Sequence, residues 1–270
     1  MEDPLCIIVY GLNELASAVA RRLRLGGHAV ALHEARAPVV LRRKMAFSDA
    51  WYDGAATLDG VEVRRADCNA DFLGGMRSGA FIPLLTHPLR EVVERWPWDV
   101  VIDARGDADH AAHRLRGSAE LTIALGDGAV AGTDCDLVIE TTGPDPGAVI
   151  RQGCAHASAI VSVATNDGVY SPASGLFHAR RIIGEVIGAG HLLGVVDHMP
   201  VAAPRAGRVR GLQRSPRSVR AGDILAELGP CDAGQVSGVD RINRLVARSV
   251  AFAIDIELNW PAMRFENLKW

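Results

Sequence analysis

The chain has 270 residues, of which 49% are hydrophobic and 23% are charged, and its formal net charge is −3. This composition is typical of a globular protein with one large domain or two ordinary ones, and it excludes a mainly disordered chain. The small negative charge does not favour nucleic acid as a partner. No apolar run approaches the ~20 residues of a membrane-spanning helix.

The N-terminus and the cysteines indicate the compartment. The first eleven residues, MEDPLCIIVYG, lack the basic region and the cleavage site of a secretory signal, so we expect a cytoplasmic protein. The five cysteines form no Cys-x-x-Cys pair and have no metal-ligand spacing. We therefore expect buried free thiols and no metal site.

The first 34 residues have the order of a mononucleotide-binding unit. The β-branched run at 5–10 predicts a buried strand, and Gly11 ends it. A helix is expected over 14–25, where a glycine pair follows, and a second strand over 28–34. Strand, glycine turn, helix and strand in this order predict a Rossmann-like domain.

The glycine fingerprint of that unit is altered. In the pattern G-x-G-x-x-G/A, Asn13 stands at the second glycine, which normally lets a pyrophosphate approach the backbone. Glu14 adds negative charge at the helix N-terminus, and its carboxylate could take the place of the anion there. Glu34 ends the second strand, where an acid can bind a ribose hydroxyl; a solvated acid is the alternative. This turn therefore has two interpretations: it binds a nucleotide at Gly11 and Asn13, or the fold is kept without the ligand.

A basic triplet and a turn follow. Arg42, Arg43 and Lys44 could bind an anionic ligand or form a solvated helix face. Alternating residues around Asp59-Gly60 predict a β-hairpin.

The middle of the chain predicts more strands of a mostly parallel sheet. Strands are expected within 81–86, 98–105, 120–132 and 136–143, and a helix over 88–95. Ligands of open α/β sheets bind at the carboxyl ends of the strands. The candidate ligand-binding residues there are Asp103, Arg105, Gly126, Asp127, Gly128, Glu140 and Thr141. Asp103 and Glu140 could form an acid pair; plain turn chemistry is the alternative for the whole set.

Two segments near the C-terminus repeat at an offset of 32 residues. Pro172, Gly175 and Gly190 of the first copy match Pro204, Gly207 and Gly222 of the second. Such paired half-motifs resemble the lipoyl/biotinyl-like barrel-sandwich hybrid, a small all-β module. A swinging-arm carrier of that kind needs a lysine in the hairpin between the halves.

The hairpin between the two copies carries His198 instead of a lysine, and the chain has no lysine between Lys44 and Lys269. A lipoyl or biotinyl group is therefore excluded from the repeat, and an exposed turn histidine without a special role is expected. Helical spacing over 239–258 predicts a long C-terminal helix that packs back onto one domain. Its apolar face is compatible with a homodimer, and the two tryptophans of the tail could dock on a neighbour.

Several stretches together resemble a known family. They read GLNELASAVARRLRLGGHAVALHEARAPVVLRRKMAFSDAWYDG, VVIDAR, IALGDGAVAGTDCDLVIETTGPDPGAVI, PVAAPRAGRVRGL and VRAGDILAEL, in this order, within residues 9–230. The chain resembles the accessory proteins of the selenium-dependent molybdenum hydroxylase system, relatives of the xanthine dehydrogenase maturation factors. The resemblance implies a Rossmann-like domain at 1–165, a barrel-sandwich module at 166–232, and a C-terminal helix and tail at 233–270.

The resemblance also implies a function. Family members equip a molybdenum hydroxylase with its pterin-dinucleotide cofactor and look like handling or insertion factors rather than turnover enzymes. Carried over by motif, the ligand-facing residues are Gly11, Arg42, Arg43, Asp103, Arg105, Gly126, Gly128 and Glu140. Two parts depart from the family pattern: the turn at 11–17, which is close to G-A-G-D-L-A-S in the family, and residues 142–145, where the family has a basic R-G-H element.

Three functions compete at this point. The first is a molybdenum hydroxylase accessory protein that transiently binds a molybdopterin nucleotide or the apo-enzyme. The second is a non-catalytic scaffold or partner-binding paralogue that has lost the nucleotide site. The third is a nicotinamide-dependent oxidoreductase, against which Asn13 and Glu14 argue because they stand where the pyrophosphate would lie. No catalytic residue can be assigned from the sequence.

Overall fold

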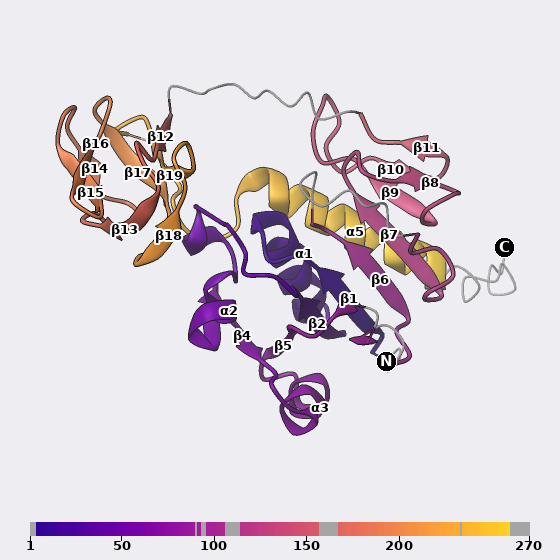
Figure 1. Ribbon diagram of the computed structural model, residues 1–270. Coiled ribbons are helices and arrows are strands. Elements are labelled where there is room, and N and C mark those ends of the chain that lie inside the picture. Colours follow the sequence, from indigo (N-terminus) through magenta and orange to yellow (C-terminus); the bar gives the residue numbers. More distant parts are fainter. Residues whose placement is uncertain are drawn as a thin grey trace, which may run out of the picture.

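The computed structural model describes residues 4–89, 91–92, 96–105, 114–156, 167–232 and 234–259. A nine-stranded sheet and a smaller all-β module make up most of these residues, and a long C-terminal helix lies along the large sheet (Figure 1). This is the α/β class that the sequence predicts. Of the helices in these ranges, none combines the length and the apolar composition that crossing a lipid bilayer requires.

The large sheet has the strand order β10-β9-β7-β6-β1-β2-β5-β4-β3. It is mostly parallel, and its antiparallel pairs are the outermost ones, β10 with β9 and β3 with β4. A separate two-stranded ladder joins β11 to β8. The strands are β1 (Cys6–Tyr10), β2 (Ala29–His33), β3 (Ala55–Leu58), β4 (Val61–Arg65), β5 (Ile82–Leu85), β6 (Val100–Asp103), β7 (Leu121–Leu125), β8 (Val130–Ala131), β9 (Leu137–Ile139), β10 (Val149–Ile150) and β11 (Gly153–Cys154).

Local sequence features determine where the first helix begins and ends and where the first hairpin turns. Helix α1 (Glu14–Leu25) has Asn13 as its N-cap and Gly26 as its C-cap, which confirms the expected helix. The hairpin of β3 and β4 turns at Asp59 and Gly60, both with positive φ, as a two-residue hairpin turn requires. The other helices are the 3-10 turn η1 (Arg43–Met45), α2 (Asp49–Asp53), α3 (Asn69–Ser78) and α5 (Arg241–Asn259).

The two faces of the large sheet are covered by different elements. Alternate residues of β1 point to opposite faces, so Ile7 packs with α1 and α5, whereas Ile8 packs with α3 and Trp98. Helix α5 lies against α1 and buries Val246 and Val250, which confirms the predicted long helix and its docking. No helix connects β7 to β9 within the described range 121–139; β8 and turns take its place.

Three other expectations have mixed outcomes. Of the helix predicted over 88–95, residues 89, 91 and 92 are helical, and 90 and 93–95 lie outside the described residues, as does the tail after 259. The thiols are free, but the prediction that they are buried is wrong for Cys68, Cys154 and Cys231, which are exposed.

The β module, residues 168–229, contains two four-stranded antiparallel sheets around their own apolar core. One sheet has the order β12-β19-β17-β14 and the other β16-β15-β13-β18. The strands are β12 (Gly168–Tyr170), β13 (Gly175–Ala179), β14 (Val186–Ile187), β15 (Leu192–Val196), β16 (Met199–Ala202), β17 (Gly207–Leu212), β18 (Arg217–Val219) and β19 (Ile224–Gly229).

The internal repeat organises this module. The offset of the repeat relates β12, β13, β14 and β15 to β16, β17, β18 and β19, respectively. Exchanging each strand for its counterpart converts the strand order of one sheet into that of the other. The register follows too: Val169 pairs with Ala226, and Val201 pairs with Gly194. One difference is a bulge in β17, where Arg210 is the extra residue between Val209 and Gly211. The module therefore consists of two related halves whose second copy is modified at β17.

Candidate functional site

The turn after β1 packs against the turn after β6. Gly11 has φ +109°, and a Cβ at this position would lie 3.1 Å from the carbonyl oxygen of Ala104. Its N–H donates to the carbonyl of His33 at 2.9 Å. A glycine is therefore needed here because the backbone that follows the neighbouring strand β6 lies close to this turn.

Asn13 occupies the N-terminus of α1 and links it to β6. Its Oδ1 accepts from the Ala16 N–H at 2.8 Å, and its Nδ2 donates to the carbonyls of Ala104 at 2.6 Å and Arg105 at 3.3 Å. The side chain is thus both a helix cap and a tether between two loops. It uses an amide N–H that a phosphate would need at this turn.

Glu14 lies in the first turn of α1, and its carboxylate also contacts a cation outside the helix. Its half-buried carboxylate lies 3.6 Å from Nη1 of Arg42. Burial raises the pKa of Glu14, and Arg42 opposes this effect. The side chain therefore belongs to the contact with the β module, which Arg42 also reaches.

Because Asn13 has two structural roles, its replacement should destabilise the fold in separable steps. We expect Asn13→Ala to lower the free energy of unfolding by about 2 kcal/mol, roughly half for the cap and half for the tether. Asn13→Ser keeps a capping oxygen and should lose only about 1 kcal/mol. Urea denaturation measures both changes, and equal losses for the two variants would show that the cap contributes nothing.

Asp103 and Arg105 pair with each other at the end of β6. The Nε of Arg105 donates to Oδ1 of Asp103 at 2.9 Å, and a second guanidinium nitrogen contacts Oδ2. The guanidinium also lies 5.7 Å from the ring centroid of Tyr10, whose pKa is raised by burial and by Asp103. The two predicted site residues do lie together at the carboxyl edge, as an ion pair within one turn.

Glu140 is the most enclosed of the predicted acids, with 2% of its surface exposed. It accepts from the N–H groups of Thr141 at 3.0 Å, Thr142 at 3.1 Å and His156 at 2.8 Å, and it contacts Nδ1 of His156 at 2.7 Å. Burial alone raises the pKa of Glu140, but these hydrogen bonds outweigh it, so the pKa lies below its usual range. The carboxylate therefore joins its own turn at 141–142 to the backbone at His156.

The loops after β7 and β9 converge as predicted. A Cβ on Gly126, which has φ +87°, would lie 3.1 Å from Oγ1 of Thr141. Asp127 and Gly128 follow in the same half-buried turn. The suggested acid pair is wrong, however, because β7 lies between β6, which ends at Asp103, and β9, which Glu140 follows, and each carboxylate has its own partner.

The basic triplet lies elsewhere, at the junction with the β module. Arg42 donates through Nε to Oε2 of Glu227 at 2.7 Å, and Lys44 donates to the carbonyl of Ile183 at 2.8 Å. Arg43 donates to the carbonyl of Leu212 at 3.1 Å. All three side chains connect the large sheet's β2–β3 connection to the β module, which the solvated helix face of one interpretation did not include. Anion binding by the triplet stays a prediction.

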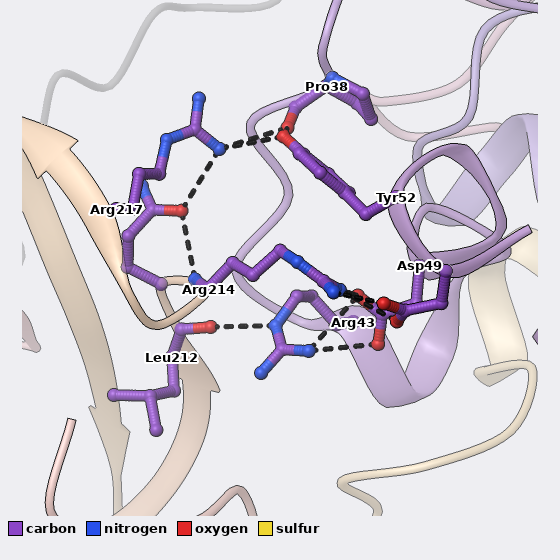
Figure 2. Close-up of polar contacts among 9 residues, drawn as sticks. Pro38, Arg43, Asp49, Tyr52, Leu212, Arg214 and Arg217 are labelled. Atoms are coloured by element: carbon purple, nitrogen blue, oxygen red, sulfur yellow. Dashed lines mark hydrogen bonds and ion pairs between the residues drawn. The ribbon is translucent and has the colours of Figure 1, made fainter. Parts of the chain in front are cut away.

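We call residues 38–53 the docking segment, and Figure 2 shows how it meets the β module. Asp49 accepts from Nη1 of Arg43 at 2.8 Å and from Nη1 of Arg214 at 3.0 Å. The guanidinium of Arg214 lies 4.5 Å from the ring centroid of Tyr52. Two arginines from distant parts of the chain therefore share one carboxylate.

The same surface continues along Tyr52. Its hydroxyl donates to the carbonyl of Pro38 at 2.7 Å and accepts from Nη1 of Arg217 at 2.9 Å. Glu34 lies just before this segment: its carbonyl accepts from Nε1 of Trp51 at 3.2 Å, and its carboxylate accepts from the Arg36 N–H at 3.2 Å. Glu34 thus borders the docking segment, whereas Arg42 and Arg43 lie within it and contact the β module.

A cavity of about 440 Å³ was not anticipated from the sequence. It lies at the carboxyl ends of β4 and β5, beside the first turn of α3. Phe72, Trp96 and Trp98 line it together with polar residues. The tryptophans were visible in the sequence, but nothing in their spacing indicated that Phe72 joins them.

We compared the chain with protein families, with curated proteins and with solved structures. No protein-family model matches the chain. The uncharacterized protein YqeB of Escherichia coli (strain K12) is 31% identical over 230 residues, which is 83% of this chain and 42% of that protein. The chain therefore spans less than half the length of this relative.

Solved structures give weak matches. An aspartoacylase family protein from Mesorhizobium loti aligns with 84% of this chain and 85% of its own, at 16% identity and a TM-score of 0.28. The ectoine utilization protein EutE from Ruegeria pomeroyi aligns with 35% of this chain and 24% of its own, at 24% identity and a TM-score of 0.22. These TM-scores carry no conclusion about a shared fold.

Proposed function

We propose that the chain is an accessory protein of a molybdenum hydroxylase system, whose cargo is a pterin-dinucleotide molybdenum cofactor and whose partner is the apo-enzyme. The motif resemblance within residues 9–230 supports this proposal.

The contacts of Asn13 carry most weight in choosing between functions. A nicotinamide-dependent oxidoreductase binds its pyrophosphate at the glycine turn, where Asn13 caps α1 and bonds to Ala104. Residues 11–14 therefore do not fit a dinucleotide phosphate, which argues against hydride transfer and means that a pterin dinucleotide would have to place its phosphates elsewhere on the chain. The same observation favours a second candidate, a non-catalytic scaffold that has lost the nucleotide site and binds a protein partner in the cytoplasm, alone or as a homodimer.

The β module is part of the proposal. We infer that it is a barrel-sandwich hybrid and that the chain divides into a Rossmann-like domain at 1–165, this module at 166–232, and a helix and tail at 233–270. The exchange of the two sheets by the repeat supports this inference. His198 stands exposed in the hairpin between β15 and β16, where a carrier would need its lysine.

A thermal-shift panel with molybdopterin nucleotides, CTP, ATP, NAD(H) and NADP(H) tests the proposal. A ligand at ~100 times its Kd adds about 2.7 kcal/mol, which raises Tm by about 5 °C or more. We expect such a shift with a pterin nucleotide and none with the nicotinamide nucleotides. We also expect the loaded chain to activate an apo-hydroxylase.

The panel also separates the alternatives. A shift with NAD(H) that grows in Asn13→Gly would favour the oxidoreductase. No shift with any nucleotide, together with stable binding of the apo-enzyme, would favour the scaffold.

A further inference from the structure

The cavity beside α3 has the position and size of a small-molecule site. It opens where β4 and β5 end, the edge at which α/β sheets bind ligands. Its volume of about 440 Å³ lies within the range of ~300–1,000 Å³ for ligand pockets. None of the predicted site residues lines it, so it is separate from the groups at 103–105 and 126–141.

An aromatic cluster forms its inner wall. The rings of Phe72 and Trp96 meet edge to face with centroids 5.0 Å apart and an interplanar angle of 88°. Trp98 lies 6.1 Å from Phe72 and is held by a hydrogen bond from its Nε1 to the carbonyl of Val92 at 3.1 Å. Because the rings hold one another in place, the wall is preorganised to contact a flat, apolar ligand surface.

The described part of the rim is polar. It carries the side chains of Asp67, Asn69, His87 and Glu91, and none of the described lining residues is a lysine or an arginine. Both carboxylate oxygens of Asp67 accept from Nε of Arg65, at 2.8 and 3.1 Å, but a carboxylate has about four acceptor positions. The rim therefore favours a ligand with N–H donors and disfavours a phosphate.

The start of α3 supplies the complementary group. Its N-cap residue Cys68 makes no side-chain capping hydrogen bond. The first N–H groups of a helix have no partner within the helix, so those next to the cavity can donate to a ligand carbonyl. Donors at the helix start and a carboxylate at Asp67 together match the edge of a lactam, which presents a carbonyl beside an N–H.

We propose that this cavity binds a neutral, planar heterocyclic base with a lactam edge, of the guanine or pterin type. The base would stack in the aromatic wall and place its N–H groups on Asp67, with any phosphate directed out of the cavity. The class of ligand follows from the cavity itself. The choice of a pterin over guanine rests on the proposed function.

Calorimetric titration of the full chain with 6-hydroxymethylpterin, guanosine and adenosine tests this proposal. We expect the two lactam bases to bind at least 10-fold more tightly than adenosine, which lacks the carbonyl and the adjacent N–H. Asp67→Asn should weaken lactam binding about 10-fold, and Trp96→Leu should abolish it. Glu62→Gln changes a half-buried acid on β4 outside the cavity; it is the matched control and should bind as the wild type does.

Circular dichroism establishes that each variant is folded, and Asp67 is exposed, so its variant tests binding without disturbing the core. Equal affinity for adenosine, or lactam binding that is unchanged in both Asp67→Asn and Trp96→Leu, would overturn the proposal. Lactam binding at this cavity without activation of an apo-hydroxylase would leave the inference standing and reject the proposed function. Activation of an apo-hydroxylase while no base binds at this cavity would reject the inference and leave the proposed function standing.

Discussion

Replacing Glu140 by leucine is expected to lower the free energy of unfolding by about 3 kcal/mol or more. The carboxylate is buried and accepts from three backbone N–H groups and from His156. Leucine would leave those donors without a partner, and each buried unsatisfied donor costs about 1–3 kcal/mol. Urea denaturation at pH 7 measures the loss.

Glu140→Gln is the control, because it keeps one acceptor oxygen and should lose less than the leucine variant. Since the pKa of Glu140 is lowered in the folded protein, the carboxylate stabilises the fold above its unfolded pKa. That contribution disappears as the pH falls through the folded pKa. The difference between wild type and Glu140→Gln should therefore shrink below about pH 4. A constant difference from pH 7 to pH 3 would contradict this account.

Gly211→Ala is expected to loosen the β module from the docking segment. A Cβ at Gly211 would lie 2.8 Å from Cβ and 3.1 Å from the carbonyl carbon of Leu41. Leu41 would have to move, and its carbonyl would lose the hydrogen bond from the Leu212 N–H at 2.9 Å. Overpacking of this kind costs about 1–3 kcal/mol. Arg42 and Arg43 come directly after Leu41, so a shift of Leu41 should disturb their contacts as well.

Trypsin offers a direct readout of that change, since the docking segment contains the triplet 42–44. We expect cleavage there to be several-fold faster in Gly211→Ala than in the wild type. Gly234→Ala is a matched control, because a Cβ at Gly234 has no neighbour within 4 Å and its φ is not in the left-handed region. Unchanged cleavage at the triplet would show that Leu41 yields without releasing the module.

Local signals explain which parts of the fold could be predicted. Asn13 and Gly26 act on residues within one turn, so α1 begins and ends where the sequence indicates. The hairpin at Asp59-Gly60 is equally local. The repeat was visible because its glycines and prolines recur at one spacing, and the strands follow it.

The contacts of the candidate site could not be predicted in the same way. Arg42 pairs with Glu227, 185 residues further along the chain, and nothing near either residue specifies the other. The pattern identified Asn13 as a departure from the glycine fingerprint, but its partner Ala104 becomes a neighbour only when β6 joins β1. Charge and position at a strand end are therefore insufficient to tell a ligand-binding residue from a structural one.

The interleaving of the two halves of the β module has a consequence for how the chain folds during synthesis. Strand β12 pairs with β19, β13 with β18 and β14 with β17, so most ladders join the first half to the second. The first half alone leaves these strand edges without partners, and the pairings are distant in sequence. We therefore expect the module to form in one cooperative step only after residue 229 has left the ribosome, while a chain stopped between the halves exposes open edges prone to aggregation.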